Sequence, residues 1–186
     1  MRLQGRAFLP SIHFSHIPNA VGFIDSGSGR GVVLKLKIID SLAFFSGLSD
    51  DEKKTVSELN LRIFKYEPRT LIIKARGGDN HLFFLVKGTA TVVGASKEPV
   101  AILKTGDVFG EISFLSNTHK RSADVVSNTD AIVMRVDREA FKTLSPIIRE
   151  KLKDKLINII LERLLSSETG YDLDISTSTF DWAKSG

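Results

Sequence analysis

The feature that most constrains this fold is a series of short β-rich segments between Leu61 and Val136. Turn-forming residues separate the segments, as at Glu67-Pro68 and at Asn128-Thr129-Asp130. Many short strands joined by such turns predict a β-sandwich or a β-barrel. The expected strands lie at 62–66, 70–74, 82–86, 89–93, 100–103, 123–126 and 131–136.

Helices are expected on both sides of this β-rich part. Residues 32–45 carry apolar side chains at helical rather than strand spacing, and Ser49 to Glu52 forms a capping box that predicts a helix through about Leu59. Ser145-Pro146 has the hydroxyl and proline of a helix start, and we expect this helix to end near Ser166. The chain therefore divides into an irregular segment 1–31, a domain 32–167 with strands at about 61–136 and a C-terminal helix at about 146–166, and a polar tail 168–186.

The C-terminal helix has apolar residues on more than one face. Ile157, Leu161 and Leu164 follow the helical repeat on a face different from the one that carries Leu152 and Leu156. One stripe can pack on the β-rich part, which leaves the other without a partner. Because soluble proteins seldom leave such a stripe in water, we expect a homodimer joined through this helix.

A second feature lies between the expected strands at 100–103 and 123–126. The turn Thr105-Gly106-Asp107 leads into Gly110 and Glu111, then a short apolar run, and Arg121-Ser122 follows ten residues after Glu111. A glycine allows close approach of a ligand to the backbone, and arginine offers a planar fork of donors to phosphate oxygens. A carboxylate accepts from a sugar hydroxyl. This combination indicates a site for a sugar phosphate.

The pattern from Phe109 to Arg121-Ser122-Ala123 resembles the phosphate-binding cassette of the cyclic-nucleotide-binding domain family, with the spacing of its bacterial catabolite-activator branch. The segment from Leu82 to Val92 also resembles strands of that family. The resemblance implies a mainly β fold with flanking helices, namely an eight-stranded jelly-roll β-roll with N-terminal helices and a long C-terminal helix. It also implies a regulatory module that binds a cyclic nucleotide and relays binding through the C-terminal helix.

The resemblance assigns roles to matching residues of this chain. Arg121 and Ser122 would bind the cyclic phosphate together with the backbone amides near Ile112 and Ser113, and Glu111 with the Gly110 backbone would hold the ribose hydroxyl. The apolar wall for the base would be formed by Val92, Val100, Leu103 and Phe109. In relatives the C-terminal helix caps the base, and the polar candidates here are Asn158, Glu162 and Arg163.

The choice between cyclic AMP and cyclic GMP stays open, because the residues that would read the base are not identified; the bacterial-branch resemblance favours cyclic AMP. A second hypothesis is a degenerate member of the same fold that serves as a protein-interaction scaffold without ligand. One sequence departure that favours it is Phe114, where the family usually has a smaller aliphatic residue.

Composition argues against other classes of protein. The chain has 186 residues, no cysteine and only four histidines, none in a His-x-His pair, so we expect no enzyme, no metal and no cofactor beyond the nucleotide ligand. No apolar run approaches the length of a membrane span, and we expect no membrane insertion and a cytoplasmic location. The short tail after the C-terminal helix leaves no room for a helix-turn-helix, so we expect no DNA binding by the chain itself and an effector protein of unknown identity.

Overall fold

The computed structural model describes residues 23–24, 29–116 and 120–168. Three helical elements lie before Leu61, where the longer strands begin: α1 (Gly29–Ser41), η1 (Ala43–Phe45) and α2 (Asp50–Ser57). The predicted capping box is present at the start of α2, where the Ser49 hydroxyl accepts from the Glu52 amide at 3.2 Å and the Glu52 carboxylate accepts from the Ser49 amide at 2.9 Å. The residues of the N-terminal segment up to 22 and of the tail from 169 lie outside the described part of the chain.

The strands form two antiparallel sheets. In the described residues the strands are β1 (Phe23–Ile24), β2 (Leu61–Tyr66), β3 (Leu71–Ile73), β4 (Leu82–Lys87), β5 (Ala90–Val93), β6 (Pro99–Leu103), β7 (Val108–Phe109), β8 (Asp124–Ser127) and β9 (Ala131–Val136). One sheet has the order β1-β2-β9-β4-β7 and the other β3-β8-β5-β6. Strands β2 to β9 form the eight-stranded roll expected from the sequence. The two-residue strands β1 and β7 were not predicted, because two residues are too few to show the alternation that marks a strand.

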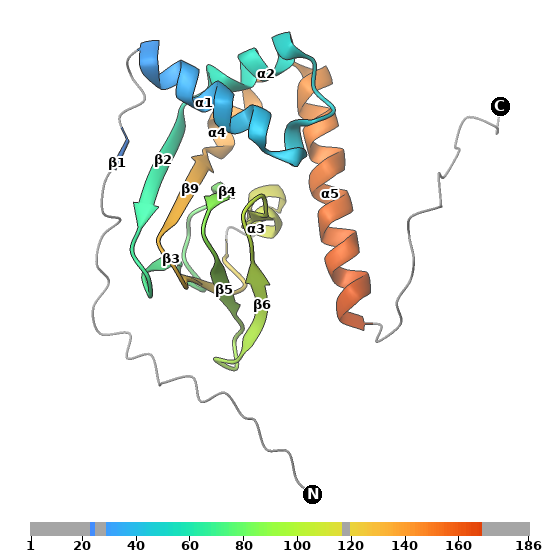
Figure 1. The fold of residues 1–186 in the computed structure, drawn as a ribbon. Coiled ribbons are helices and arrows are strands. Elements are labelled where there is room, and N and C mark those ends of the chain that lie inside the picture. The colour runs from blue at the N-terminus through green and yellow to red at the C-terminus, as the bar shows by residue number, and fades with distance from the viewer. Residues whose placement is uncertain (1–22, 25–28, 117–119, 169–186) are drawn as a thin grey trace, which may run out of the picture.

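Strand β4 lies between two hydrophobic clusters, one shared with the helices and one inside the roll. Side chains alternate between the two faces of a strand, so Leu82 and Phe84 pack with the helices while Phe83 and Leu85 point into the roll. Phe84 contacts Phe44 and Phe45 of η1 with ring centroids 5.1 Å apart. Both faces of this strand are buried, which fixes the helices against the outside of the first sheet (Figure 1).

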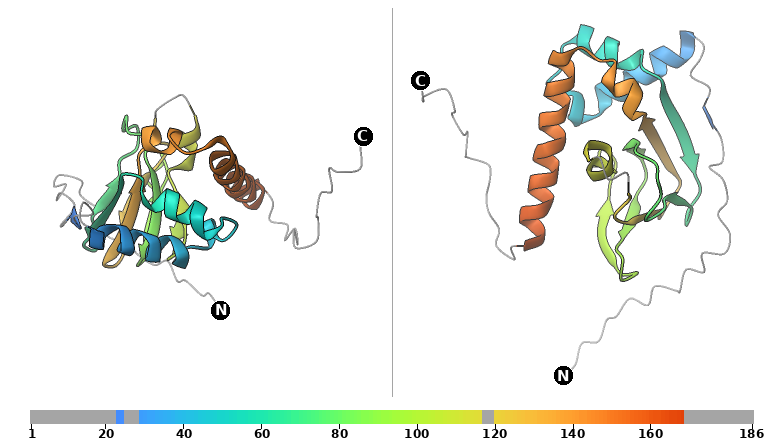
Figure 2. Two further views of the ribbon diagram at one scale, coloured as in Figure 1. Left: turned by 90° about the horizontal axis from the view of Figure 1, so that it is seen from above. Right: turned by 180° about the vertical axis from the view of Figure 1, so that it is seen from behind.

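Helix α3 (Glu111–Leu115) lies between β7 and β8. After β9 the chain forms α4 (Arg138–Lys142) and then the long helix α5 (Pro146–Glu168). The start of α5 agrees with the prediction, and the Ser145 hydroxyl accepts from the Ile148 amide at 3.4 Å. Leu152 and Leu156 anchor the first half of α5 in the core. Its second half runs down beside the roll to the level of β5 and β6 (Figures 1 and 2).

The second apolar stripe of α5 stays on the surface. Ile157, Leu161 and Leu164 are each between 47% and 50% exposed, whereas Leu152 and Leu156 are buried. In the part of the chain that the structure describes, no helix combines the length and the apolar character needed to cross a bilayer.

Candidate functional site

The site is built around the turn from β7 into α3. Gly110 adopts a left-handed conformation with φ +78°, which favours glycine. A Cβ atom at this position would lie 2.5 Å from Nη1 of Arg121 and 3.1 Å from the carbonyl oxygen of His81. The glycine therefore permits both the turn and the close approach of Arg121. Phe114, the unusual residue of the motif, is buried against Phe141 and does not crowd the cavity.

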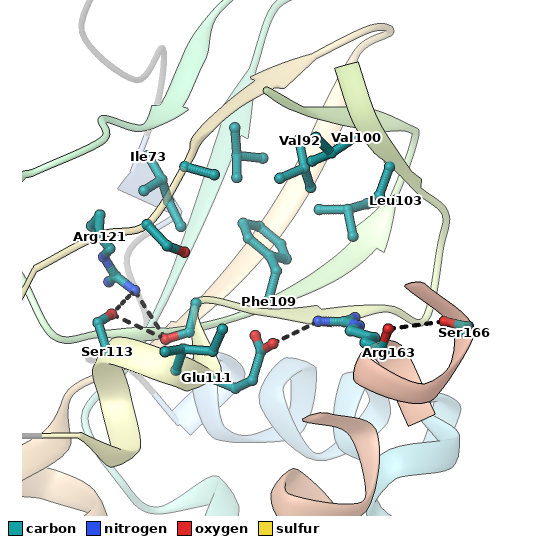
Figure 3. Close-up of a pocket in the computed structure, with 16 residues that line it drawn as sticks. Ile73, Val92, Val100, Leu103, Phe109, Glu111, Ser113, Arg121, Arg163 and Ser166 are labelled. Atoms are coloured by element: carbon teal, nitrogen blue, oxygen red, sulfur yellow. Dashed lines mark hydrogen bonds and ion pairs between the residues drawn. The ribbon is translucent and has the colours of Figure 1, made fainter. Parts of the chain in front are cut away.

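A cavity of about 370 Å³ lies above this turn (Figure 3). That volume is within the ordinary range for small-molecule sites. All the residues that the sequence singled out for ligand binding line it: Val92, Val100, Leu103, Phe109, Gly110, Glu111, Ile112, Ser113, Arg121 and Ser122. The cavity also takes in Ile73, Ala101, Ala123, Val125, Arg163 and Ser166.

Arg121 lies buried at one end of the cavity, and its hydrogen bonds go to protein groups. Its Nε donates to Asp79 Oδ1 at 3.0 Å, and Nη2 donates to Asp79 and to the His81 carbonyl oxygen at 2.7 Å. Its Nη1 donates to the Gly110 carbonyl oxygen at 3.0 Å and to Ser113 Oγ at 2.6 Å. A guanidinium has five N–H donors, and each has an acceptor here. The fork is thus held by the protein rather than open toward the cavity.

Asp79 is the carboxylate that balances Arg121, and no motif in the sequence marks it as a site residue. Burial disfavours its charged form, but hydrogen bonds from His81 and Arg121 outweigh burial and hold the pKa of the Asp79 carboxyl well below its usual range. The only local signal was Gly77-Gly78-Asp79, which marks a turn before β4. A turn sequence does not show which distant cation the carboxylate will meet.

Glu111 lies in the middle of the cavity floor and pairs with α5. Its Oε1 accepts from Nη1 of Arg163 at 2.8 Å, and Nη2 of Arg163 donates to the Val108 carbonyl oxygen at 2.6 Å. The Glu111 side chain is 6% exposed and that of Arg163 is 41% exposed. Figure 3 shows Arg121 and Arg163 at opposite ends of the cavity with Glu111 between them. Of the three polar candidates on α5, only Arg163 lines the cavity, and Asn158 and Glu162 are exposed elsewhere.

The opposite wall of the cavity is apolar. Leu103 and Phe109 are buried, and Phe109 stacks on Phe83 with centroids 5.3 Å apart, so these residues serve the core as well as the cavity. Val100 on β6 is exposed at the cavity rim. Ser122 is also exposed, so its hydroxyl is accessible to a ligand. The cavity thus joins an apolar wall to a cation, a carboxylate and hydroxyl groups.

Comparison with known proteins gives a consistent result. Residues 63–145 match the family described as the cyclic nucleotide-binding domain. Over 123 residues the chain is 31% identical to the cAMP-dependent protein kinase regulatory subunit of Pyricularia oryzae, which covers 63% of this chain and 31% of that protein. The chain spans about a fifth to a third of the length of such curated kinase relatives.

Two solved structures have a similar fold. The regulatory subunit of a cAMP-independent protein kinase A from Trypanosoma brucei has a TM-score of 0.60 and 26% identity, over 76% of this chain and 47% of that one. The structure described as cAMP bound PfPKA-R has a TM-score of 0.61 and 25% identity, over 76% of this chain and 50% of that one. The family is a regulatory binding domain rather than a catalytic one.

Proposed function

We propose that this chain, which belongs to the cyclic nucleotide-binding domain family, binds a cyclic nucleotide in the cavity beside α3 and signals its presence through α5. The observation that carries the proposal is the convergence of Glu111, Arg121 and Ser122 on a single cavity with an apolar wall. Cyclic AMP is the favoured ligand, and cyclic GMP is the second candidate. The likeness to a structure described as cAMP bound supports this order.

The cyclic phosphate would lie at the Arg121 end, where Ser122 and the backbone near Ile112 and Ser113 supply further donors. Every donor of Arg121 already has an acceptor, so a phosphate oxygen has to replace one of them. The replaceable acceptors are the Gly110 carbonyl and the Ser113 hydroxyl, because both residues line the cavity. A phosphate is a stronger acceptor for a guanidinium than either neutral group, so the exchange is favourable.

The ribose would lie at Glu111, and this contact would carry the signal. A ribose hydroxyl that donates to Glu111 competes with Arg163 for the same carboxylate. Since Arg163 belongs to α5, losing this ion pair and the bond to the Val108 carbonyl releases the C-terminal half of the helix from the cavity rim.

The alternative is a protein-interaction scaffold of the same fold without a ligand. One observation is compatible with it: in the structure both charged recognition groups, Arg121 and Glu111, are already paired with protein groups. Such a site is stable while empty, so the pairing fits a scaffold as well as a sensor. Binding therefore has to be measured directly.

Titration calorimetry with cyclic AMP, cyclic GMP and linear 5′-AMP separates the two functions. We expect one cyclic AMP per chain, weaker binding of cyclic GMP, and much weaker binding of 5′-AMP, whose extra charge and open phosphate do not fit the ring-closed geometry. The control is Arg62→Ala, an exposed arginine on β2 that should leave binding unchanged. Absence of heat with either cyclic nucleotide at millimolar concentration would establish the scaffold.

We also propose that α5 joins two copies of the chain. Ile157, Leu161 and Leu164 form an exposed apolar stripe, and a helix packed on its copy would cover it. The double variant Ile157→Glu, Leu161→Glu should be a folded monomer by light scattering at tens of micromolar, whereas wild type should have twice the mass. A monomeric wild type at that concentration would refute the dimer. The output of the module would then pass either across the dimer or to an effector protein.

A further inference from the structure

His81 lies between two carboxylates, Asp79 at the Arg121 end of the cavity and Asp137 outside the cavity. Its Nδ1 lies 3.3 Å from Asp79 Oδ1 and its Nε2 lies 2.8 Å from Asp137 Oδ1. Its backbone carbonyl oxygen accepts from Nη2 of Arg121 at 2.7 Å. Arg135 of β9 lies on the far side, with Nε 3.9 Å from Asp137 Oδ1. Charges of opposite sign therefore alternate from Arg121 through Asp79, His81 and Asp137 to Arg135.

The contact of Asp137 with His81 leaves the start of α4 without a side-chain cap. It occupies the N-cap position of α4, where an aspartate side chain ordinarily accepts from a helix amide. Here its side chain makes no such bond and faces His81 instead. The Asp137 carboxylate is therefore paired with the histidine and not with the start of α4.

A histidine between two carboxylates satisfies both only in its protonated form. A neutral imidazole has one N–H donor and one lone pair, so one carboxylate would face the lone pair. The imidazolium donates from both nitrogens and meets both Asp79 and Asp137. The other charged groups nearby keep their charge near neutral pH, so they do not take the place of the proton on His81. Arg121 and Arg135 stay cationic. Burial raises the pKa of the Tyr66 phenol, which lies within electrostatic range of Asp79 and Arg135.

Asp79 transmits the state of His81 to the cavity. Its Oδ1 atom accepts from both His81 and Arg121, so the two cations share one negative charge. When His81 is neutral, Arg121 alone balances Asp79, and less of its positive charge remains for a ligand. We propose that His81 is a positioning residue for Arg121, and that protonation of His81 strengthens the attraction of the cavity for an anionic phosphate. This inference rests on the proposed function.

Binding of cyclic AMP measured between pH 5.5 and pH 8 tests the inference. A cyclic phosphodiester keeps one negative charge over this range, so the ligand does not titrate. We expect the affinity of wild type to fall about three- to tenfold as the pH rises, the effect of one partly screened charge near the phosphate. His81→Gln should bind with the weaker affinity at every pH. Asp137→Asn, which removes one partner of His81 without touching the cavity, should reduce the pH dependence.

A ligand-free measurement keeps the test independent of the proposed function. In wild type the ¹H–¹⁵N signal of Arg121 Nε should shift with pH together with the signals of the His81 ring protons in the same sample. The same signal should be constant in His81→Gln. If cyclic AMP does not bind at any pH, the proposed function fails, and this signal alone decides the role of His81. The inference would be overturned if the Arg121 Nε signal does not change together with the His81 signals, or if binding to His81→Gln depends on pH as strongly as binding to wild type.

Discussion

The two ends of the cavity are constructed differently. At the deep end, Arg121 is buried and bonded to groups from the loop before β4 and from the turn into α3, all within the roll. At the other end, Glu111 depends on Arg163, a half-exposed side chain from a helix outside the roll. The deep end is fixed by the fold, whereas the outer end is fixed only while α5 is docked. We infer that the deep end supplies affinity and the outer end reports that the cavity is occupied.

The largest expected effect is at the deep end. Arg121→Ala should weaken binding of cyclic AMP by about 2–5 kcal/mol, or roughly 30-fold to several thousandfold, because it truncates one partner of a shielded charge pair. The structure also predicts a lower melting temperature, since Asp79 and the carbonyl groups of Gly110 and His81 lose their donor. Calorimetry below the melting transition measures the affinity.

Arg121→Lys is the companion variant for this prediction. Lysine keeps the charge but cannot form the planar fork, so it should recover part of the affinity and little of the stability. An Arg121→Ala protein that melts like wild type and binds cyclic AMP within threefold of it would contradict the assignment of the deep end.

A smaller loss is expected at the centre of the cavity. Glu111→Ala should weaken binding by roughly 1.5–3 kcal/mol, because the lost carboxylate accepts from a neutral ribose hydroxyl and water can partly take the place of that carboxylate. Calorimetry on the same nucleotide gives the comparison, and 2′-deoxy cyclic AMP is the matched ligand. The deoxy ligand should bind wild type and Glu111→Ala almost equally. A larger loss for Glu111→Ala than for Arg121→Ala would reverse the proposed roles of the two ends.

Acid stability tests the Asp79–Arg121 pair without a ligand. The pKa of Asp79 is lower in the folded protein than in the unfolded chain, so the unfolded chain binds more protons in the acid range. The stability from this group is therefore present above about pH 3.9 and is lost as the pH falls below that value. Asp79→Asn should cost on the order of 1–2 kcal/mol at neutral pH, a figure reduced because the Asp79 side chain is 40% exposed.

The measurement is urea unfolding of wild type and Asp79→Asn between pH 2.5 and pH 7. The difference in the free energy of unfolding between wild type and Asp79→Asn should become smaller as the pH falls. Asp51→Asn, an exposed aspartate of α2, is the control and should show no such trend from this pair. A constant difference across the range would show that the Asp79 charge does not stabilise the fold.

The smallest effect is expected at the outer end. Arg163→Met should raise the affinity for cyclic AMP only a few-fold, because a half-exposed ion pair contributes roughly 0.2–1 kcal/mol that the ribose no longer has to displace. Hydrogen exchange gives the sharper readout: cyclic AMP should change exchange in residues 157–168 of wild type and leave the same amides unchanged in Arg163→Met. The paired control is Glu162→Met, the neighbouring exposed residue.

The sequence was informative where a motif is local. Gly110, Glu111 and Arg121 come from one short stretch, and their shared cavity follows from the turn that the stretch forms. Asp79 and His81 were missed because their partners are distant in sequence, and pairing across the roll leaves no local pattern. Among the polar candidates on the C-terminal helix, helix geometry could have identified Arg163 as the one that faces the cavity. Arg163 lies seven residues after the buried Leu156, so it continues the stripe that packs on the roll.

A single NMR titration tests the central claim, that a cyclic nucleotide occupies both ends of this cavity. The side-chain Nε signals of Arg121 and Arg163 are followed in one spectrum while cyclic AMP is added. We expect both signals to move with one common affinity, Arg121 staying protected from water and Arg163 losing the protection that Glu111 gives it. Two unchanged arginine signals at millimolar cyclic AMP would contradict binding in this cavity, and movement of Arg121 alone would contradict the role of α5.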